Sequence, residues 1–378
     1  MIRVGITGQS GFVGTHLFST LGLSPEKFKR IDFDDYYFSD NAKLTEFVSS
    51  CDVIVHLAAL NRHKDPEIIF NTNVDLVQKL ITVCNTADVK PHILFSSSTQ
   101  EELNNLYGRS KKEGRERFEN WAVSNNAKYT GFVIPNVFGP FGKPFHNSVV
   151  ATFCYQLTHD QTPRVDNDSE LKLIYVGELV SLIIKDIEAK FNNPFENNVD
   201  TILVPHSYVI KVSQLLGKLL DMKDNYITAG GLPDLNQIFD LHLFNTLLTF
   251  IDINTFFPYH LKLNTDHRGS FVETLKLKSG GQVSFSTTNP GITRGNHFHT
   301  RKAERFAVIK GDARIELRQI GTTNKISYTL SGKIPSFVDM PVWYTHNITN
   351  IGDEDLFTIF WINEFFDAND PDTFFEQV

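Results

Sequence analysis

Two histidines and a glutamate stand close together late in the chain, in the stretch GITRGNHFHTRKAERFAVIKG. His297 and His299 are separated by one residue, so both side chains point to the same side if this segment is an extended strand. Glu304 follows after a short predicted turn, and His346 stands in the later stretch PVWYTHNITN. Imidazole and carboxylate ligands without a thiolate suit a first-row divalent ion, and Zn²⁺, Fe²⁺, Mn²⁺ and Ni²⁺ all remain open. The spacing therefore predicts a metal site, although an HFH pair alone is also compatible with two surface histidines.

A glycine-rich turn near the N-terminus has the spacing of a nucleotide-binding loop. In RVGITGQSGFVGTHL an apolar strand leads into Gly8, and Gly11 and Gly14 follow at three-residue intervals. Without side chains at these positions, the backbone can approach a pyrophosphate at the N-terminus of the next helix. Downstream, CDVIVHLAAL ends a second strand with the small residues Ala58 and Ala59, where a cofactor can pass closely. Together these features predict a dinucleotide site.

The residues near the second predicted strand leave the choice of dinucleotide open. Asp32, in KRIDFDD, would bind an unphosphorylated ribose, whereas the neighbouring Lys29 and Arg30 could accept a 2′-phosphate. We expect NADPH, with NADH as the alternative. The expected cofactor contacts are Gly8, Gly11, Phe12, Val13, Gly14, Asp32, Leu57, Ala58, Ala59, Tyr107 and Lys111.

Tyr107 and Lys111, in YGRSK, are four residues apart and so share one face of a predicted helix. A phenol, with a pKa of ~10, is a poor acid–base catalyst at neutral pH, and a nearby lysine cation beside a charged nicotinamide would stabilise its phenolate. Ser98, the last serine of FSSS, offers a hydroxyl to hold a substrate carbonyl. These residues predict a hydride-transfer site in which the tyrosine protonates the developing alkoxide. The alternative is a surface helix that carries tyrosine and lysine by chance.

The elements that must position these residues fall into two groups along the chain. Residues 1–190 alternate short apolar strands, such as IRVGIT, DVIVHLA, HILFSSS and KYTGFVI, with longer amphipathic segments, which predicts a doubly wound parallel sheet of the Rossmann type. Residues 200–250 have a mostly helical pattern, and INTFFPYH is a predicted linker. Beyond it, short strands with turn residues recur and predict an all-β sandwich or barrel. The fold class is α/β followed by an all-β domain, with domains at 1–250 and 259–378.

The bulk composition limits the partners and the compartment. Net charge is −8 without a basic block, which argues against nucleic acid or an anionic membrane as the main partner. The three cysteines show no CxxC spacing, the N-terminus lacks a secretory layout, and no apolar run approaches the ~20 residues of a membrane span. We therefore expect a cytoplasmic protein that acts on a small molecule.

Residues 1–245 resemble the extended short-chain dehydrogenase/reductases, on the glycine turn, HLAA, FSSS, YGRSK and PNVFGP. The resemblance implies an NAD(P)-dependent enzyme that acts on a nucleotide-activated sugar. It also implies that Asn136 and the following GPFGKPFHNS line the sugar-nucleotide pocket. Eight residues separate Ser98 from Tyr107, fewer than in most members, so we expect a trimmed loop on the substrate side.

The C-terminal third resembles the cupins, on the spacing Gly291, HFH, Glu304 and Gly311 and on a partial second motif with Pro341 and His346. Trp343 stands where that motif usually has glycine. DHRGSFVE and GITRGNHFH also resemble the dTDP-sugar 3,5-epimerases, which implies sugar-nucleotide contacts at Arg268, Glu273 and Arg294. The alternative for Arg268 is an exposed cation in a hairpin turn.

Over nearly its whole length the sequence resembles the two-domain capsular-polysaccharide enzymes of the CapF type, on HLAALNRH, LYGRSK, PNVFGP, DHRGSF, GNHFH and PVWYTHNI. The resemblance implies a UDP-2-acetamido-2,6-dideoxy-4-hexulose substrate, epimerisation at carbon-3 in the cupin and NADPH-dependent reduction at carbon-4, towards UDP-N-acetyl-L-fucosamine. Among the divalent ions we expect zinc, and the cupin resemblance implies a homodimer. Two alternatives remain: a single-function reductase whose cupin serves dimerisation or sugar binding, and a non-catalytic NAD(P)H sensor.

Overall fold

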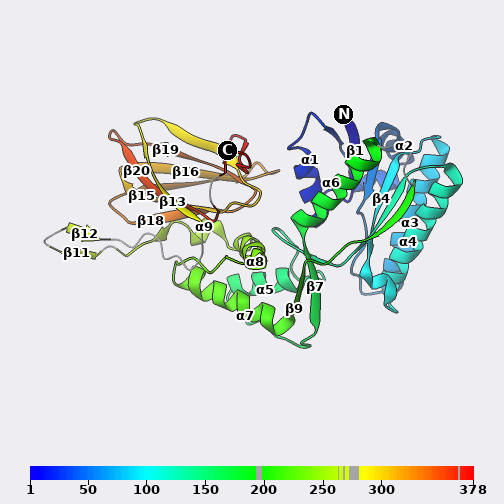
Figure 1. The fold of residues 1–378 in the computed structure, drawn as a ribbon, viewed down its shortest axis with the longest axis horizontal. Coiled ribbons are helices and arrows are strands. Elements are labelled where there is room, and N and C mark those ends of the chain that lie inside the picture. Colours follow the sequence, from blue (N-terminus) through cyan, green and yellow to red (C-terminus); the bar gives the residue numbers. More distant parts are fainter. Residues whose placement is uncertain (193–197, 263, 267–268, 272–280, 365–366) are drawn as a thin grey trace. The chain divides into compact units, whose positions relative to one another are not determined.

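The structure is a computed structural model that describes residues 1–378 except 193–197, 263, 267–268, 272–280 and 365–366. The chain forms two compact units (Figure 1). The first unit contains residues 1–138, 142–149 and 169–211, and the second contains 139–141, 150–168 and 212–378.

A parallel sheet forms the centre of the first unit, in the strand order β2-β1-β3-β4-β5-β8. Every neighbouring pair in this sheet is parallel, as the alternation of strands and amphipathic segments predicts. The fold class is thereby confirmed. The strands are β1 (Ile2–Thr7), β2 (Phe28–Ile31), β3 (Val53–His56), β4 (His92–Ser98), β5 (Tyr129–Ile134) and β8 (Val199–Leu203).

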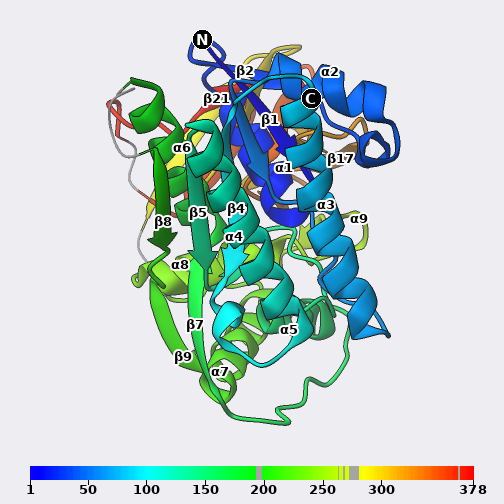
Figure 2. The same cartoon turned by 90° about the vertical axis from the view of Figure 1, so that its right-hand side faces the viewer.

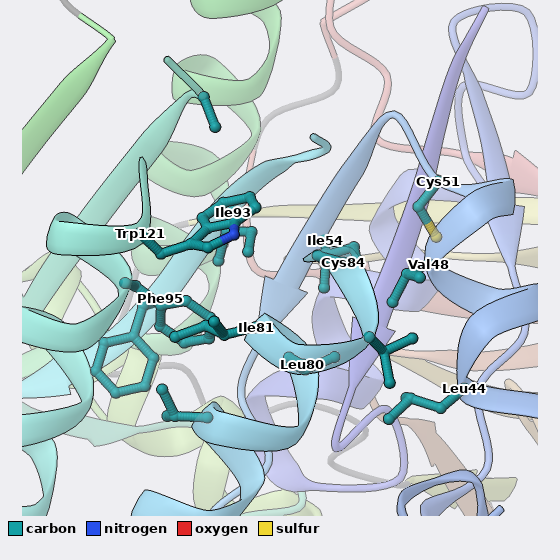
Figure 3. Close-up of a cluster of buried hydrophobic side chains, with 14 of the residues drawn as sticks. Leu44, Val48, Cys51, Ile54, Leu80, Ile81, Cys84, Ile93, Phe95 and Trp121 are labelled. Atoms are coloured by element: carbon teal, nitrogen blue, oxygen red, sulfur yellow. The ribbon is translucent and has the colours of Figure 1, made fainter. Parts of the chain in front are cut away.

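Helices cover both faces of this sheet (Figure 2). One face packs against apolar residues of α1 and α6, and the other against residues of α2, α3 and α4. Figure 3 shows part of the second cluster, which includes Leu44 of α2, Leu80 of α3, Trp121 of α4, and Ile93 and Phe95 of β4. The helices are α1 (Phe12–Leu21), α2 (Asn41–Ser50), α3 (Pro66–Thr86), α4 (Leu106–Asn125) and α6 (Val176–Asn192).

A small sheet with the order β6-β7-β9 completes the first unit. Its strands are β6 (Asn136–Phe138), β7 (Glu170–Tyr175) and β9 (Tyr208–Lys211). The prediction of a mostly helical stretch from residue 200 was wrong for β8 and β9. Both strands are short and mostly half-exposed or exposed, so they carry no clear hydrophobic period.

The second unit combines a helical part with antiparallel sheets. One sheet has the order β10-β18-β15-β20-β13 and another has β17-β16-β19-β14-β21, and side chains from both form a common core. These antiparallel sheets have the β architecture that the sequence predicts for the C-terminal domain. The helices are α5 (Val149–Thr158), α7 (Val212–Met222), the π-helix η3 (Lys223–Thr228), α8 (Ile238–Leu248) and α9 (Ile253–Phe256). The strands are β10 (Tyr259–His260), β11 (Asn264–Asp266), β12 (Gly269–Phe271), β13 (Gln282–Thr288), β14 (Thr293–Phe298), β15 (Glu304–Lys310), β16 (Asp312–Gln319), β17 (Lys325–Ser331), β18 (Ser336–Met340), β19 (Tyr344–Asn350), β20 (Leu356–Ile362) and β21 (Phe374–Phe375).

A buried ion pair joins the helical part to the β-sheets of the second unit. Arg305 of β15 pairs with Asp339 of β18 at 2.8 Å and donates to the carbonyl of Gly230 at 2.8 Å. The hydroxyl of Tyr226 in η3 donates to the same Asp339 carboxylate. Through these contacts the helical residues after position 212 belong to the same compact unit as the β-sheets. The domain limits of 1–250 and 259–378 stay a prediction.

Candidate active site and metal centre

The glycine-rich turn packs its backbone against the ends of β1 and β3. Gly8 has φ +71°, and a Cβ atom there would lie 2.8 Å from the backbone nitrogen of Ala58. A Cβ atom at Gly14 would lie 2.2 Å from the carbonyl oxygen of Gly8, so both positions require glycine. Helix α1 begins directly afterwards with Phe12 and Val13, and its N-terminus offers free N–H groups to a phosphate.

The expected cofactor residues that follow β2 and β3 lie at the carboxyl ends of these parallel strands. Leu57 follows β3 and donates its N–H to the carbonyl of Thr7 at 3.1 Å, which brings Ala58 and Ala59 to the end of β1. Asp32 is exposed and follows β2 directly. Arg30 donates to the carbonyl of Phe18 at 3.2 Å and lies over its ring, so its guanidinium already contacts α1.

Tyr107 and Lys111 lie on α4, as the spacing predicts. The ammonium of Lys111 donates to the carbonyl of Ser96 at 2.8 Å and lies 5.9 Å from the centroid of the Tyr107 ring. Burial lowers the pKa of Lys111 to about 8, and the charge of Glu101 opposes that shift. Burial raises the pKa of Tyr107 to about 12, which is opposite to the direction expected from a neighbouring lysine.

The short connection from Ser98 to Tyr107 forms the 3₁₀ helix η2 (Thr99–Glu102). Ser98 caps it, since its Oγ accepts from the N–H of Gln100 at 3.2 Å. Glu101 accepts from the hydroxyl of Ser97 and, through two nitrogens, from Arg115 of α4, with Nη2 at 2.9 Å. Sequence analysis missed Glu101, because a glutamate in a short polar loop carries no signal of a buried partner.

Asn73 is a second residue that sequence analysis missed. It is buried on α3, where its Oδ1 accepts from the N–H of Leu60 at 2.7 Å and its Nδ2 donates to the hydroxyl of Ser110 at 3.0 Å. It thereby ties the segment after Ala59 to the helix that carries Lys111. The available signal was an asparagine among the apolar residues of the amphipathic segment that forms α3.

Asn136 is exposed at the start of β6, and the loop after it lies against the segment that follows Ala59. Arg62 donates to the carbonyl of Phe145 at 2.5 Å, and Asn147 donates to the carbonyl of Asn61 at 3.0 Å. Phe145 and Asn147 of the predicted sugar-nucleotide loop are thus bonded to the segment that follows β3, and both residues lie in the first unit.

His297, His299, Glu304 and His346 lie together in the second unit, as predicted. Each offers one ligand atom, and these atoms all lie within 4.8 Å of one another. His297 of β14 stands opposite His346 of β19, while Glu304 begins β15 in the other sheet. The cluster therefore joins the two sheets.

Three of the four ligand atoms of this cluster are buried and lack hydrogen bonds. Nε2 of His346 lies 2.8 Å and Nε2 of His299 lies 3.4 Å from Oε2 of Glu304, yet none of these three atoms makes a hydrogen bond. Buried polar atoms normally have hydrogen-bond partners, so three such atoms that face one another without partners fit the ligand set of a cation. A set of imidazoles and one carboxylate suits a divalent first-row ion, with bonds of about 2.0–2.2 Å.

Hydrogen bonds to the other ring nitrogens orient two of these histidines. Nδ1 of His299 bonds to the carbonyl of Asp372 at 2.5 Å, and Nδ1 of His346 to that of Tyr344 at 3.2 Å. A backbone acceptor at Nδ1 leaves Nε2 as the free ligand atom. Burial, together with the charge of His346, lowers the pKa of His297 to about 4, so its imidazole is neutral at physiological pH.

Trp343 preserves the turn in which the cupin pattern usually has glycine. Its φ is +63°, in the left-handed region that favours glycine. Its N–H donates to the carbonyl of His299 at 2.8 Å, and its ring stacks on Phe298 at 5.6 Å. The substitution changes the side chain and keeps the backbone geometry beside the cluster.

The remaining predicted substrate residues are only partly described. Arg294 lies exposed on β14, and its guanidinium donates to the carbonyl of Thr287 at 3.0 Å. Arg268 and Glu273 lie outside the described residues. Among the residues that are described, no helix is long and apolar enough to cross a membrane.

Comparison with known proteins identifies both parts of the chain. Residues 4–199 match the NAD dependent epimerase/dehydratase family, and residues 264–374 match the polysaccharide biosynthesis C-terminal domain. A relative from Pseudomonas aeruginosa named UDP-2-acetamido-2,6-beta-L-arabino-hexul-4-ose reductase is 33% identical over 381 residues, which cover 99% of this chain and 98% of the relative.

Solved structures give the same picture. The crystal structure of the capsular polysaccharide assembling protein CapF from Staphylococcus aureus is 34% identical, covers 100% of both chains and has a TM-score of 0.62. A UDP-glucose 4-epimerase from Thermotoga maritima covers 66% of this chain and 98% of its own, with 18% identity and a TM-score of 0.53, so that likeness concerns the fold alone.

Proposed function

The chain belongs to the NAD-dependent epimerase/dehydratase family, in its two-domain CapF-type group, and from that membership we propose a bifunctional nucleotide-sugar enzyme. Its substrate would be a UDP-2-acetamido-2,6-dideoxy-4-hexulose, epimerised at carbon-3 in the β domain and then reduced at carbon-4 in the Rossmann-type unit. The product would lead towards UDP-N-acetyl-L-fucosamine for a surface polysaccharide. The name of the Pseudomonas relative supports a 4-ketosugar as the reducible substrate.

The reductase site would use Tyr107, Ser98 and Lys111. NADPH, with NADH as the alternative, supplies the hydride when bound at the glycine-rich turn. Ser98 would hold the carbon-4 carbonyl, and Tyr107 would give its phenolic proton to the alkoxide that forms there. Since burial raises the pKa of Tyr107 to about 12, the residue carries the proton that a reduction needs. The ammonium of Lys111 would stabilise the Tyr107 phenolate that forms when the proton leaves.

The β domain would hold a divalent ion, with zinc favoured, through His297, Glu304, His346 and His299. Such an ion would supply Lewis-acid polarisation of the ketone beside carbon-3, which acidifies the carbon-3 proton. The backbone acceptors at Asp372 and Tyr344 keep Nε2 of His299 and His346 aimed into the cluster. Arg294, three residues before His297, would contact the nucleotide-sugar, as would Arg268 and Glu273 by resemblance.

The observation that carries this proposal is the buried cluster of orphaned ligand atoms in a chain that also has the tyrosine–lysine site. The chemistry links the two sites, because epimerisation beside a ketone has a poorly biased equilibrium and reduction removes the epimerised ketone from that equilibrium. A direct test incubates the chain with a UDP-4-ketosugar and NADPH in deuterated water and analyses the product by mass spectrometry and NMR. We expect one solvent deuteron at carbon-3.

A single-function 4-ketoreductase is the second candidate. It predicts full NADPH consumption with no deuterium at carbon-3, and the β domain would then serve dimerisation or sugar binding. A non-catalytic sensor would bind the cofactor tightly and turn over no ketosugar. In either case we propose a cytoplasmic homodimer, on the basis of the composition and of the cupin resemblance.

A further inference from the structure

Asp372, near the C-terminus, binds the turn that connects two of the proposed metal ligands, His299 and Glu304. Residues 300–303, between His299 and Glu304, form no strand, so their backbone N–H groups need other acceptors. Oδ1 of Asp372 accepts from the N–H of Thr300 at 3.1 Å and from its hydroxyl at 2.6 Å. Oδ2 accepts from the N–H groups of Arg301 and Lys302 at 2.9 and 3.1 Å. One carboxylate, in a residue only 4% exposed, thus accepts from three of the four backbone N–H groups of the turn, and the N–H of Ala303 donates to Oδ1 of Asn363 at 3.1 Å.

Asp372 also contacts a proposed ligand directly. Its carbonyl oxygen bonds to Nδ1 of His299, which selects the tautomer that leaves Nε2 facing the cluster. The residue has φ +41°, a left-handed conformation that aspartate and asparagine adopt more readily than alanine. The backbone carbonyl of Asp372 therefore orients His299, and its side chain fixes the turn that directly follows His299.

A short strand keeps Asp372 in place. Strand β21 pairs with β14, where Phe375 is opposite His297 and Phe374 is opposite Phe298. The N–H of Glu376 donates to the carbonyl of Asn296 at 2.9 Å. The C-terminal segment is thus paired along the strand that carries His297.

We propose that residues 371–376 are a positioning element of the metal centre, in which Asp372 fixes the His299 imidazole and the spacing from His299 to Glu304. The inference rests on the proposed metal function. Asp372 would touch neither the ion nor the sugar. Removing such an outer partner typically lowers metal affinity about 10–100-fold.

The test measures Zn²⁺ and Co²⁺ affinity of the full chain by competition with a chromogenic chelator. Asp372→Ala is expected to lose about 10–100-fold in affinity and to change the d–d absorption of the Co²⁺ form. Asp372→Asn keeps the backbone preference and one acceptor oxygen, so its loss is smaller. Asp370→Asn is the matched control, because Asp370 lies in the same segment and pairs with Arg301 at 2.8 Å at an exposed position. It should behave as wild type.

A second readout needs no metal. Hydrogen–deuterium exchange of the metal-free protein should show at least tenfold faster exchange at residues 300–302 in Asp372→Ala, but not in Asp370→Asn. Unchanged affinity and exchange in Asp372→Ala would overturn the proposal, as would a lower Tm with an unaltered Co²⁺ spectrum. If the wild-type chain binds no divalent ion, the proposed metal function is wrong. If, in addition, residues 300–302 of the wild-type chain exchange without protection, the proposed role of Asp372 is wrong as well. If the alanine variant does not fold, the asparagine variant carries the same comparison at smaller amplitude.

Discussion

Burial sets the protonation states of the two residues at the proposed reductase site. Tyr107 is held neutral, with a pKa of about 12, and the pKa of Lys111 is lowered to about 8 because its ammonium is shielded from water. The sequence predicts the pair and its helical spacing. It does not predict the direction of the tyrosine shift, because that depends on how deeply α4 is buried, which a four-residue spacing does not encode.

The lysine pKa predicts the alkaline limit of the reductase. A lowered pKa means that the cation is present below about pH 8 and is lost above it. We therefore expect kcat/KM for ketosugar reduction to fall above about pH 8, in a profile of initial NADPH consumption between about pH 6 and 10. Lys111→Arg, slower but charged throughout, should lack that alkaline limb. A wild-type profile that stays flat to about pH 10 would contradict the role of Lys111.

Among the structural elements, the 3₁₀ helix η2 connects the serine of the site to its tyrosine. Glu101 of η2 is held by Arg115 of α4, and a Cβ atom at Gly108 would lie 1.9 Å from the carbonyl oxygen of Gln100. The trimmed loop is therefore packed tightly on the first turn of α4. This packing lets eight residues place Ser98 beside the helix of Tyr107.

Removing the charge of Glu101 should slow ketosugar reduction and should also change the pH at which kcat/KM falls on the alkaline side. Glu101 raises the pKa of Lys111, so Glu101→Gln lowers that pKa and shifts the fall in kcat/KM to a lower pH. Glu119→Gln is the matched control, because it removes only the other carboxylate partner of Arg115, at 2.8 Å. An identical pH limb in the two variants would show that Glu101 does not act on Lys111.

Closing the gap between η2 and α4 should impair reduction alone. In Gly108→Ala the new methyl group meets the Gln100 carbonyl, so η2 or the start of α4 must shift. A misplacement of about 1 Å can cost about 100-fold in rate. We expect a loss of reductase kcat of that order with unchanged metal binding, measured on the same preparation. Wild-type kcat would mean that the contact is not rigid.

The sequence predicts those features that depend on residues close together in the chain, such as a hydrophobic period or the spacing of a motif. Hydrophobic periods predict β1, β4, α3 and α4, and the spacing from His297 to Glu304 predicts the metal cluster. Trp343 shows the limit of motif matching, because its positive φ is retained without glycine. The role of Asp372 could not be predicted, since its partners lie about seventy positions earlier and only strand pairing brings them together.

In the proposed function, the whole molecule would carry two chemical sites, one on each of the two compact units of the chain. Epimerisation would make a ketone that remains in equilibrium with its precursor, and reduction would consume it. A shared chain would then supply the two activities at equal concentration. The account requires the two activities to be separable, because each depends on its own residues and on no side chain of the other site.

The most direct test of that claim compares Tyr107→Phe with His297→Ala on a UDP-4-ketosugar in deuterated water. Tyr107→Phe should lower NADPH consumption by about 10²–10⁴-fold while deuterium still enters the ketosugar at carbon-3. His297→Ala should abolish the deuterium incorporation and leave the reduction of a ketosugar that already has the epimerised configuration intact. Loss of both activities in each variant would contradict the division of labour between the two sites.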